Sequence, residues 1–208
     1  EPGAAQGGGE EMNLLVDPAP TVYTLGDKEY PLNTSFRFGI LFEQMMLDDA
    51  LSIREKGLAA LELFFPGILP TGENEAGSAI LWFYNCGKPW KRGSTARMRR
   101  AGKVFDYDQD DGYIFAAFLE QYGVDLEQVQ DLHWWKFKAM FDALRPDCLF
   151  SKIVEWRSTD LTQVKDPKEK KFIQEMKQVY RLRKSVDEQE KLDLIADALM
   201  GGGDLSKL

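Results

Sequence analysis

One apolar stretch, residues 131–144, constrains the fold of this chain more than any other. It reads DLHWWKFKAMFDAL, with two adjacent tryptophans and two phenylalanines. Placed on a helix at about 100° per residue, its apolar side chains cover most of the circumference and leave Lys138, Asp142 and Arg145 on a narrow polar strip. Because a helix that is apolar on nearly all sides is buried, we predict a central helix here.

A second stretch, residues 112–119 (GYIFAAFL), has the same character, and only Glu120 and Gln121 interrupt it before Tyr122 and Gly123. We expect these two helices to pack on each other and the other elements to pack on them. The predicted fold is mainly α: a helical domain built on two buried central helices, with a small N-terminal β-hairpin.

The hairpin is predicted from residues 21–32. Two runs suited to strands, TVYTL and KEYPL, flank Gly26 and Asp27, a two-residue turn. Pro31 lacks a backbone N–H, so the second strand is expected at an edge of the sheet.

Capping residues predict where several other helices begin. Asn33, Thr34 or Ser35 precedes an apolar run at 36–47, and Ser52 with Glu55 forms a capping box ahead of 53–65. Further helices are expected at 79–84, at 148–157 and after the Asp-Pro pair at 166–167. A second capping box, Ser185-x-x-Glu188, predicts another helix that ends before the glycines at 201–203.

These patterns suggest three regions. Residues 1–11 carry no large apolar side chain, so we expect a flexible leader, either a cloning remnant or the end of an upstream reading frame. Residues 12–184 form the helical domain with its hairpin, and residues 185–208 a C-terminal helix and tail.

Composition excludes several classes of protein. The chain of 208 residues is 44% hydrophobic and 29% charged, which fits a globular domain and excludes disorder for most of its length. Two cysteines are too few for a disulfide scaffold and indicate a reducing, cytosolic setting. No apolar run approaches the roughly 18 residues that a membrane span needs, so no membrane association is expected.

A basic arm, defined as residues 88–103, interrupts an otherwise acidic chain. It carries seven positive charges and no negative one: Lys88, Lys91, Arg92, Arg97, Arg99, Arg100 and Lys103. Because the net charge of the whole chain is -8, the remainder carries -15. The arm could bind nucleic-acid phosphates, with release of their counterions, or dock on an acidic protein surface. We favour protein docking over nucleic-acid binding, because the chain as a whole is acidic.

Catalytic and metal sites are hard to assemble from these residues. His133 is the only histidine and falls in the apolar arc of the central helix, as a core or interface residue would. The acidic cluster at 106–112 misses calcium-loop spacing, because Asp111 occupies the sixth position and Ala117 the twelfth, so helix capping is the favoured role. No phosphate-binding glycine loop occurs. We predict no enzyme activity, no cofactor and no metal.

Several blocks resemble a known phage family. They are FDYD at 105–108, YIFAAFLEQYGVDL at 113–126, LHWWKFKAM at 132–140, Ile153-x-x-Trp-Arg-Ser158 and Lys171-Phe-x-x-x-Met-Lys-x-x-Tyr180. Together with ELFFPG at 62–67 they look like the family named for gene product fifteen of Gram-positive long-tailed siphophages. The similarity covers about residues 22–184, and the LHWWKF block is its most specific part.

The resemblance implies a function without naming a catalytic residue. Members are encoded just before the tape-measure protein and are thought to be tail assembly chaperones, absent from the mature virion. The expected partners are therefore the tape-measure protein, other copies of this chain in a homo-oligomer, and an upstream-frame chaperone partner, all in the host bacterial cytoplasm. Candidate partner-binding residues are the seven cations of the basic arm, His133 and Trp134. The alternatives are a nucleic-acid-binding phage factor acting through the basic arm, and a structural tail component.

Overall fold

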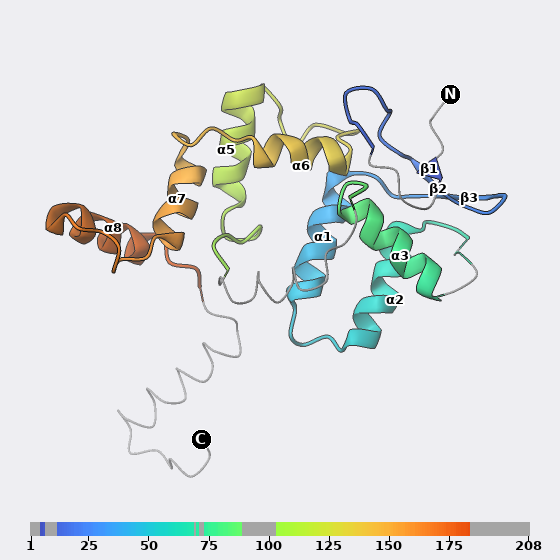
Figure 1. Ribbon diagram of the computed structural model, residues 1–208, viewed down its shortest axis with the longest axis horizontal. Helices are drawn as coiled ribbons and strands as arrows, with labels where there is room; N and C mark the ends of the chain where they lie inside the picture. Colours follow the sequence, from blue (N-terminus) through green and yellow to red (C-terminus); the bar gives the residue numbers. More distant parts are fainter. Residues whose placement is uncertain (1–4, 7–11, 69, 71–72, 89–102, 184–208) are drawn as a thin grey trace, which may run out of the picture. The chain divides into compact units, whose positions relative to one another are not determined.

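The computed structural model describes residues 5–6, 12–68, 70, 73–88 and 103–183, and they are mainly helical, as predicted (Figure 1). The chain divides into two compact units. Unit 1 comprises Glu1–Lys103 and Asp111–Ser151, and unit 2 comprises Val104–Asp110 and Lys152–Leu208.

The predicted hairpin of unit 1 is present. Strands β2 (Val22–Leu25) and β3 (Lys28–Pro31) pair antiparallel, with Tyr23 opposite Tyr30. Gly26 occupies the turn at a φ of 60°, which glycine adopts without steric cost. A short strand β1 (Ala5–Gln6) pairs parallel with β2, so part of the segment that we expected to be a flexible leader joins the sheet. Strand β3, with Pro31, lies at the edge, as predicted.

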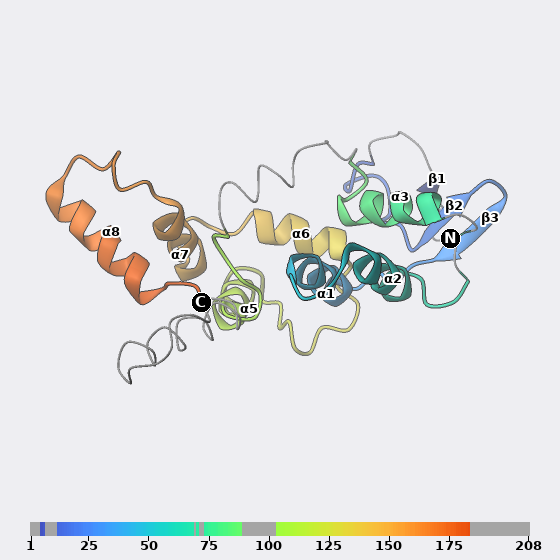
Figure 2. The same cartoon turned by 90° about the horizontal axis from the view of Figure 1, so that it is seen from below.

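Three successive helices follow: α1 (Phe36–Leu47), α2 (Ile53–Phe64) and α3 (Glu73–Tyr84). They lie side by side in both views (Figures 1 and 2). Ser35 caps α1, and the capping box of α2 is complete: Glu55 N donates to Ser52 Oγ at 3.3 Å, and Ser52 N donates to Glu55 Oε2 at 2.8 Å. The capping signals in the sequence were therefore sufficient to locate both starts.

The two helices expected at the centre are α5 (Asp111–Tyr122) and α6 (Trp134–Asp142), and they do pack together. The Phe118 and Phe137 rings stack at 5.0 Å, and Tyr122 Oη donates to the carbonyl of Met140 at 2.8 Å. Neither helix is buried on all sides, however. Leu119 of α5 is 46% exposed, and the second half of α6 is largely accessible. Each helix buries one stripe, because its neighbours in unit 1 cover only one side.

Helix α6 begins later than the apolar pattern predicted. Residues 131–133 are not helical, and His133 is the residue that caps α6. A backbone bridge pairs His133 with Ser35, the cap of α1: Phe36 N donates to Leu132 O at 2.9 Å and Trp134 N to Thr34 O at 2.7 Å. Helices α1 and α6 therefore begin side by side from this bridge, a long-range contact that no local pattern reveals.

The adjacent tryptophans join α6 to α1 and to the end of α3. Their indole N–H groups donate to consecutive carbonyls, Trp134 to Tyr84 at 2.9 Å and Trp135 to Phe83 at 2.7 Å. Trp134 also lies flat on α1 at Gly39, where an added Cβ would stand only 2.1 Å from Cε3 of the indole. Trp134 is fully buried and Trp135 is 3% exposed, so the two tryptophans lie in the core of unit 1.

Unit 2 contains α8 (Pro167–Val179) and most of α7 (Leu149–Ser158), whose first residues belong to unit 1. Asp166 caps α8 and Pro167 occupies its first turn, as predicted. The ring centroid of Trp156 lies 5.9 Å from that of Phe172 and 5.5 Å from that of Tyr180, so the three residues form a partly exposed aromatic cluster. The C-terminal helix predicted beyond residue 184 lies outside the described residues.

Arg157 connects the two chain segments of unit 2, 104–110 and 152–183. Its guanidinium donates two bonds to Asp110, at 2.6 and 2.9 Å, and further bonds to the carbonyls of Tyr180 at 2.6 Å and Val104 at 3.1 Å. Asp110 is 1% exposed. The acidic cluster thus has mixed roles, since Asp106 accepts bonds from the local turn and Asp111 lies in the first turn of α5, whereas Asp110 forms a buried ion pair.

Candidate functional site

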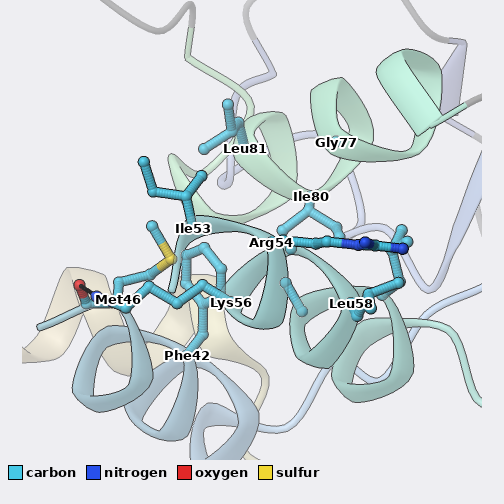
Figure 3. A pocket seen from close by; sticks show the side chains of 12 residues that line it. Phe42, Met46, Ile53, Arg54, Lys56, Leu58, Gly77, Ile80 and Leu81 are labelled. Carbon is cyan, nitrogen blue, oxygen red and sulfur yellow. Dashed lines mark hydrogen bonds between the residues drawn. The ribbon is translucent and has the colours of Figure 1, made fainter. Parts of the chain in front are cut away.

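An open groove lies on unit 1. It lies between α1, α2 and α3 and has a volume of about 480 Å³ (Figure 3). Figure 3 shows Phe42, Met46 and Ile53 toward one end and Arg54 and Leu58 toward the other. The groove residues are Phe42, Met46, Ile53, Arg54, Lys56, Gly57, Leu58, Ala60, Leu61, Gly77, Ile80 and Leu81.

Large apolar side chains of the groove remain in contact with water. Ile53 is 91% exposed, Leu58 52% and Met46 42%. Covering apolar surface is favourable by about 25 cal/mol per Å². Contiguous exposed apolar surface that polar residues border is typical of a site that binds another polypeptide or a ligand. The groove therefore has the surface chemistry of a docking site.

Two glycines form part of the groove within helices that would be more stable with alanine. Gly57 lies inside α2 and Gly77 inside α3, where glycine costs about 1 kcal/mol relative to alanine. An added Cβ at either position would meet nothing within 4 Å. Since internal packing does not require these glycines, their effect is to keep the groove wide and to expose helix backbone along it.

The charged residues of the groove are both cations. Arg54 and Lys56 line it from α2, and no carboxylate does. Lys56 Nζ donates to the carbonyl of Met46 at 2.9 Å, which ties the start of α2 to the end of α1. An occupant with an apolar face and flanking carboxylates would match this surface.

None of the predicted partner-binding residues that the structure describes lines the groove. Of the basic arm, the structure describes Lys88 and Lys103 alone, and Asn85 Nδ2 donates to the carbonyl of Lys88 at 2.7 Å. The remaining five cations, at 91, 92, 97, 99 and 100, lie outside the described residues. Their role in binding a partner stays a prediction.

His133 and Trp134, also predicted to contact a partner, are inside unit 1. His133 Nδ1 accepts from Trp135 N at 3.0 Å, and its Nε2 lies 3.0 Å from the carbonyl of Pro20. This pairing requires the neutral ring with its proton on Nε2. Burial lowers the pKa of His133, which keeps the ring neutral. Both residues have internal structural roles, so neither belongs to the groove that we consider for docking.

Cys86 is a described residue with a potentially reactive side chain. Burial raises the pKa of the Cys86 thiol to about 11, so it stays protonated near neutral pH and is a poor nucleophile. Among the described residues, no group of three or more histidine, cysteine or carboxylate side chains could hold a metal ion. Within the same residues, no helix is long and apolar enough to cross a membrane. That the chain is not an enzyme stays a prediction.

Sequence reasoning missed both the groove and the Asp110–Arg157 pair. A partial signal for the groove was present, because Gly57 and Gly77 each interrupt a helical pattern in the sequence. The ion pair had no local signal, since its residues are 47 positions apart.

Comparison with known proteins identifies the class and then the family. Residues 15–182 match the family described as Bacteriophage Gp15 protein. No curated protein and no solved structure matches the chain. Because the family match spans most of the sequence, the chain is a phage protein of the structural or morphogenesis class. It belongs to the Bacteriophage Gp15 family, which confirms the resemblance found in its sequence blocks.

Proposed function

We propose that this protein is a tail assembly chaperone, which binds the tape-measure protein and forms homo-oligomers during phage tail morphogenesis. It acts in the cytoplasm of the host bacterium and is absent from the mature virion. Family membership supports the general class, and the groove between α1, α2 and α3 is the observation that carries the finer assignment.

The groove suits a helical client. A tape-measure protein is a long, largely helical chain with apolar stripes, and it must stay soluble until the tail tube forms around it. An amphipathic helix binds by laying its apolar face in a groove of this kind. The exposed side chains of Ile53, Leu58 and Met46 supply the apolar contacts, and the glycines permit close approach.

Two other features support self-association. Strand β3 is an edge strand, whose unpaired backbone groups offer a site for another strand. In addition, an acidic chain that carries a basic arm is complementary to further copies of itself, which suits head-to-tail assembly.

Client binding is tested with overlapping peptides that tile the tape-measure protein of the same phage. Leu58→Glu places a carboxylate in the groove and should weaken binding of the apolar peptides at least tenfold, as measured by fluorescence anisotropy. Val179→Glu, an equally drastic change at an exposed position of α8, should leave affinity unchanged. Failure of every peptide to bind the unaltered protein would remove the proposed client.

Self-association is tested by size exclusion with light scattering, alone and with the peptides that bind. We expect a mass of several copies that depends on protein concentration. A strict monomer under all conditions would contradict oligomerisation. Mass spectrometry of purified virions then separates a chaperone, which should be absent, from a structural tail component, which should be present.

A further inference from the structure

We propose that the groove between α1, α2 and α3 receives an apolar turn, residues 13–17, from a second copy of this chain. The turn and the groove both belong to unit 1. Copies then join head to tail, each inserting its turn into the groove of the next. Self-association belongs to the proposed function, on which this inference rests, and the turn and the groove supply its interface.

Hydrogen bonds hold the apolar turn in one shape. Asn13 N donates to Asp17 Oδ2 at 2.8 Å, and Leu15 N donates to Asn13 Oδ1 at 3.0 Å. The carbonyl of Asn13 accepts from Val16 N at 2.9 Å and from Asp17 N at 2.7 Å. Because an ordered loop loses less conformational entropy on binding than a flexible one, this turn is prepared to dock.

The tip of the turn is apolar and exposed. Leu15 is 95% exposed and Val16 77%, although the backbone that carries them is hydrogen-bonded. In the groove, Ile53 and Leu58 are 91% and 52% exposed. Adjacent apolar side chains that are held in water mark a contact surface. Docking the turn in the groove would remove both apolar surfaces from water together.

The groove has room for the turn. Its volume of about 480 Å³ lies within the roughly 300–1,000 Å³ of sites that enclose drug-sized molecules, so it can accept the side chains of Leu15 and Val16. Gly57 and Gly77 widen it, because a Cβ added at either position would meet nothing within 4 Å.

The charges of the two surfaces are opposite. Asp17 is the only charged residue among residues 12–20. The charged residues that line the groove are Arg54 and Lys56, and Figure 3 shows Arg54 at the same end as Leu58. A carboxylate next to the inserted side chains and cations beside the apolar wall fix the orientation of the two copies.

The apolar turn and the groove lie at opposite ends of α1. Pro20, three residues after the turn, has its carbonyl 3.0 Å from His133, which pairs with Ser35 at the start of α1. The groove includes Met46 in the last turn of α1 and Ile53 beyond it. Figure 1 shows the dark blue segment before β2 near the start of α1 and away from the start of α2. The contact therefore joins two copies, and since its two surfaces differ, it builds chains or rings.

Mixing two variants of the full chain tests the interface by size exclusion with light scattering. Leu15→Asp removes the apolar tip and Leu58→Glu blocks the groove, so each variant alone should be monomeric where the unaltered protein assembles. An equal mixture should form a complex of two copies and nothing larger, because only one intact turn can meet one intact groove. Val179→Glu, at an exposed position of α8, is the control and should assemble like the unaltered protein.

Three results of the mixing experiment would overturn the proposal. They are an unaltered protein that stays monomeric, variants that assemble as the unaltered protein does, and a mixture that stays monomeric.

Crosslinking between isotopically distinct copies tests the location with the groove intact. A photoreactive phenylalanine analogue at position 15 of a heavy-isotope-labelled chain should crosslink to peptides containing 46–58 or 77–81 of an unlabelled chain, identified by mass spectrometry. The same analogue at position 28, exposed on β3, is the control and should give at least fivefold fewer of these products. Crosslinks from position 15 that stay within the labelled chain, or that avoid the groove, would contradict the proposal.

Competition distinguishes this inference from the proposed client. At concentrations where the unaltered chain assembles, Leu15→Asp leaves every groove empty and should bind tape-measure peptides several-fold more tightly. Equal affinities would contradict a shared groove. Peptide binding together with a monomeric mixture would remove the interface and leave the client, whereas a two-copy complex without binding of any peptide would support the interface and count against the client.

Discussion

Single residues near the starts of α1 and α6 determine how the core of unit 1 packs. Gly39 allows the indole of Trp134 to lie against the backbone of α1, and His133 accepts the N–H of Trp135 while its other ring nitrogen pairs with Pro20. The role of Gly39 depends on its missing Cβ, and the role of His133 depends on its neutral imidazole. Each role therefore predicts a specific response to substitution or to pH.

Gly39→Ala should destabilise unit 1 by about 1–3 kcal/mol, because the added Cβ would stand 2.1 Å from Trp134 and the helices must move apart. Urea unfolding followed by tryptophan fluorescence measures the change in the free energy of unfolding. Gly112→Ala, which adds the same methyl group to open space in α5, is the control and should leave that free energy unchanged or raise it by up to about 1 kcal/mol, because alanine favours the helix. Equal effects of the two substitutions would contradict the packing argument.

The stability of the fold should depend on the protonation of His133. Burial lowers its pKa from the ordinary 6.5, so the unfolded chain takes up this proton at a higher pH than the folded chain. The stability that the neutral His133 ring contributes is fully present above pH 6.5, and it is lost as the pH falls from there toward the pKa of His133 in the folded chain. Measured between pH 7.5 and 5, the free energy of unfolding should therefore fall more steeply for the unaltered protein than for His133→Asn, which retains a capping acceptor but does not titrate. Parallel pH profiles would contradict a neutral, buried His133.

At the scale of elements, the two units are held by different means. Unit 1 depends on aromatic contacts between helices, of which the Phe118–Phe137 stack at 5.0 Å is one. In unit 2, by contrast, Arg157 of α7 joins the loop at Asp110 to the end of α8 at Tyr180. Removing one partner of a buried ion pair leaves an unpaired buried charge, which is strongly unfavourable.

Arg157→Leu should therefore destabilise unit 2 by about 3–5 kcal/mol. Hydrogen exchange with mass spectrometry separates the two units: amides of α8 and the end of α7 should exchange much faster, whereas amides of α1 and α6 should not change. Arg181→Leu, an exposed arginine of the same unit, is the control and should leave the exchange of α8 close to that of the unaltered protein. Uniform acceleration throughout the chain would contradict a local role for Arg157.

At the scale of the whole molecule, charge is distributed unevenly. The basic arm carries seven positive charges, and residues 165–184 contain eight cations against three carboxylates, so the acidic character belongs to the rest of the chain. This second basic region includes α8 and escaped the sequence analysis because its lysines are interspersed with carboxylates. In the described part of this region, Lys168, Lys170 and Lys171 are exposed, so α8 presents a positively charged surface.

The charge pattern also tests the nucleic-acid alternative. For a chain of net charge -8 we expect no binding of labelled duplex DNA or RNA near 150 mM salt, and at most weak binding at low salt. Fluorescence anisotropy across a salt series measures this affinity. Tight binding that falls steeply with salt, and that is lost on replacing Arg97, Arg99 and Arg100 with glutamate, would favour the nucleic-acid factor over the chaperone.

Local chemistry in the sequence was enough to predict much of the fold. The turn at Gly26-Asp27, the capping box at Ser52 and Glu55, and the Asp166-Pro167 start each act over four residues or fewer, so they are visible without the fold. Sequence blocks such as LHWWKF also predicted the correct family. These features depend on neighbours in the chain, which is why they could be found in one sequence.

Only the tertiary structure decided which apolar surface is buried and which is left open. Asp131 to His133 leave the predicted helix because Ser35, almost a hundred residues earlier, pairs with His133. Asp110 meets Arg157, and Ile53 and Leu58 face a groove rather than a core, through contacts between distant segments. Helical periodicity identifies an apolar side chain, but its burial depends on the element that folds against it, and that choice is made by the packing of the whole unit.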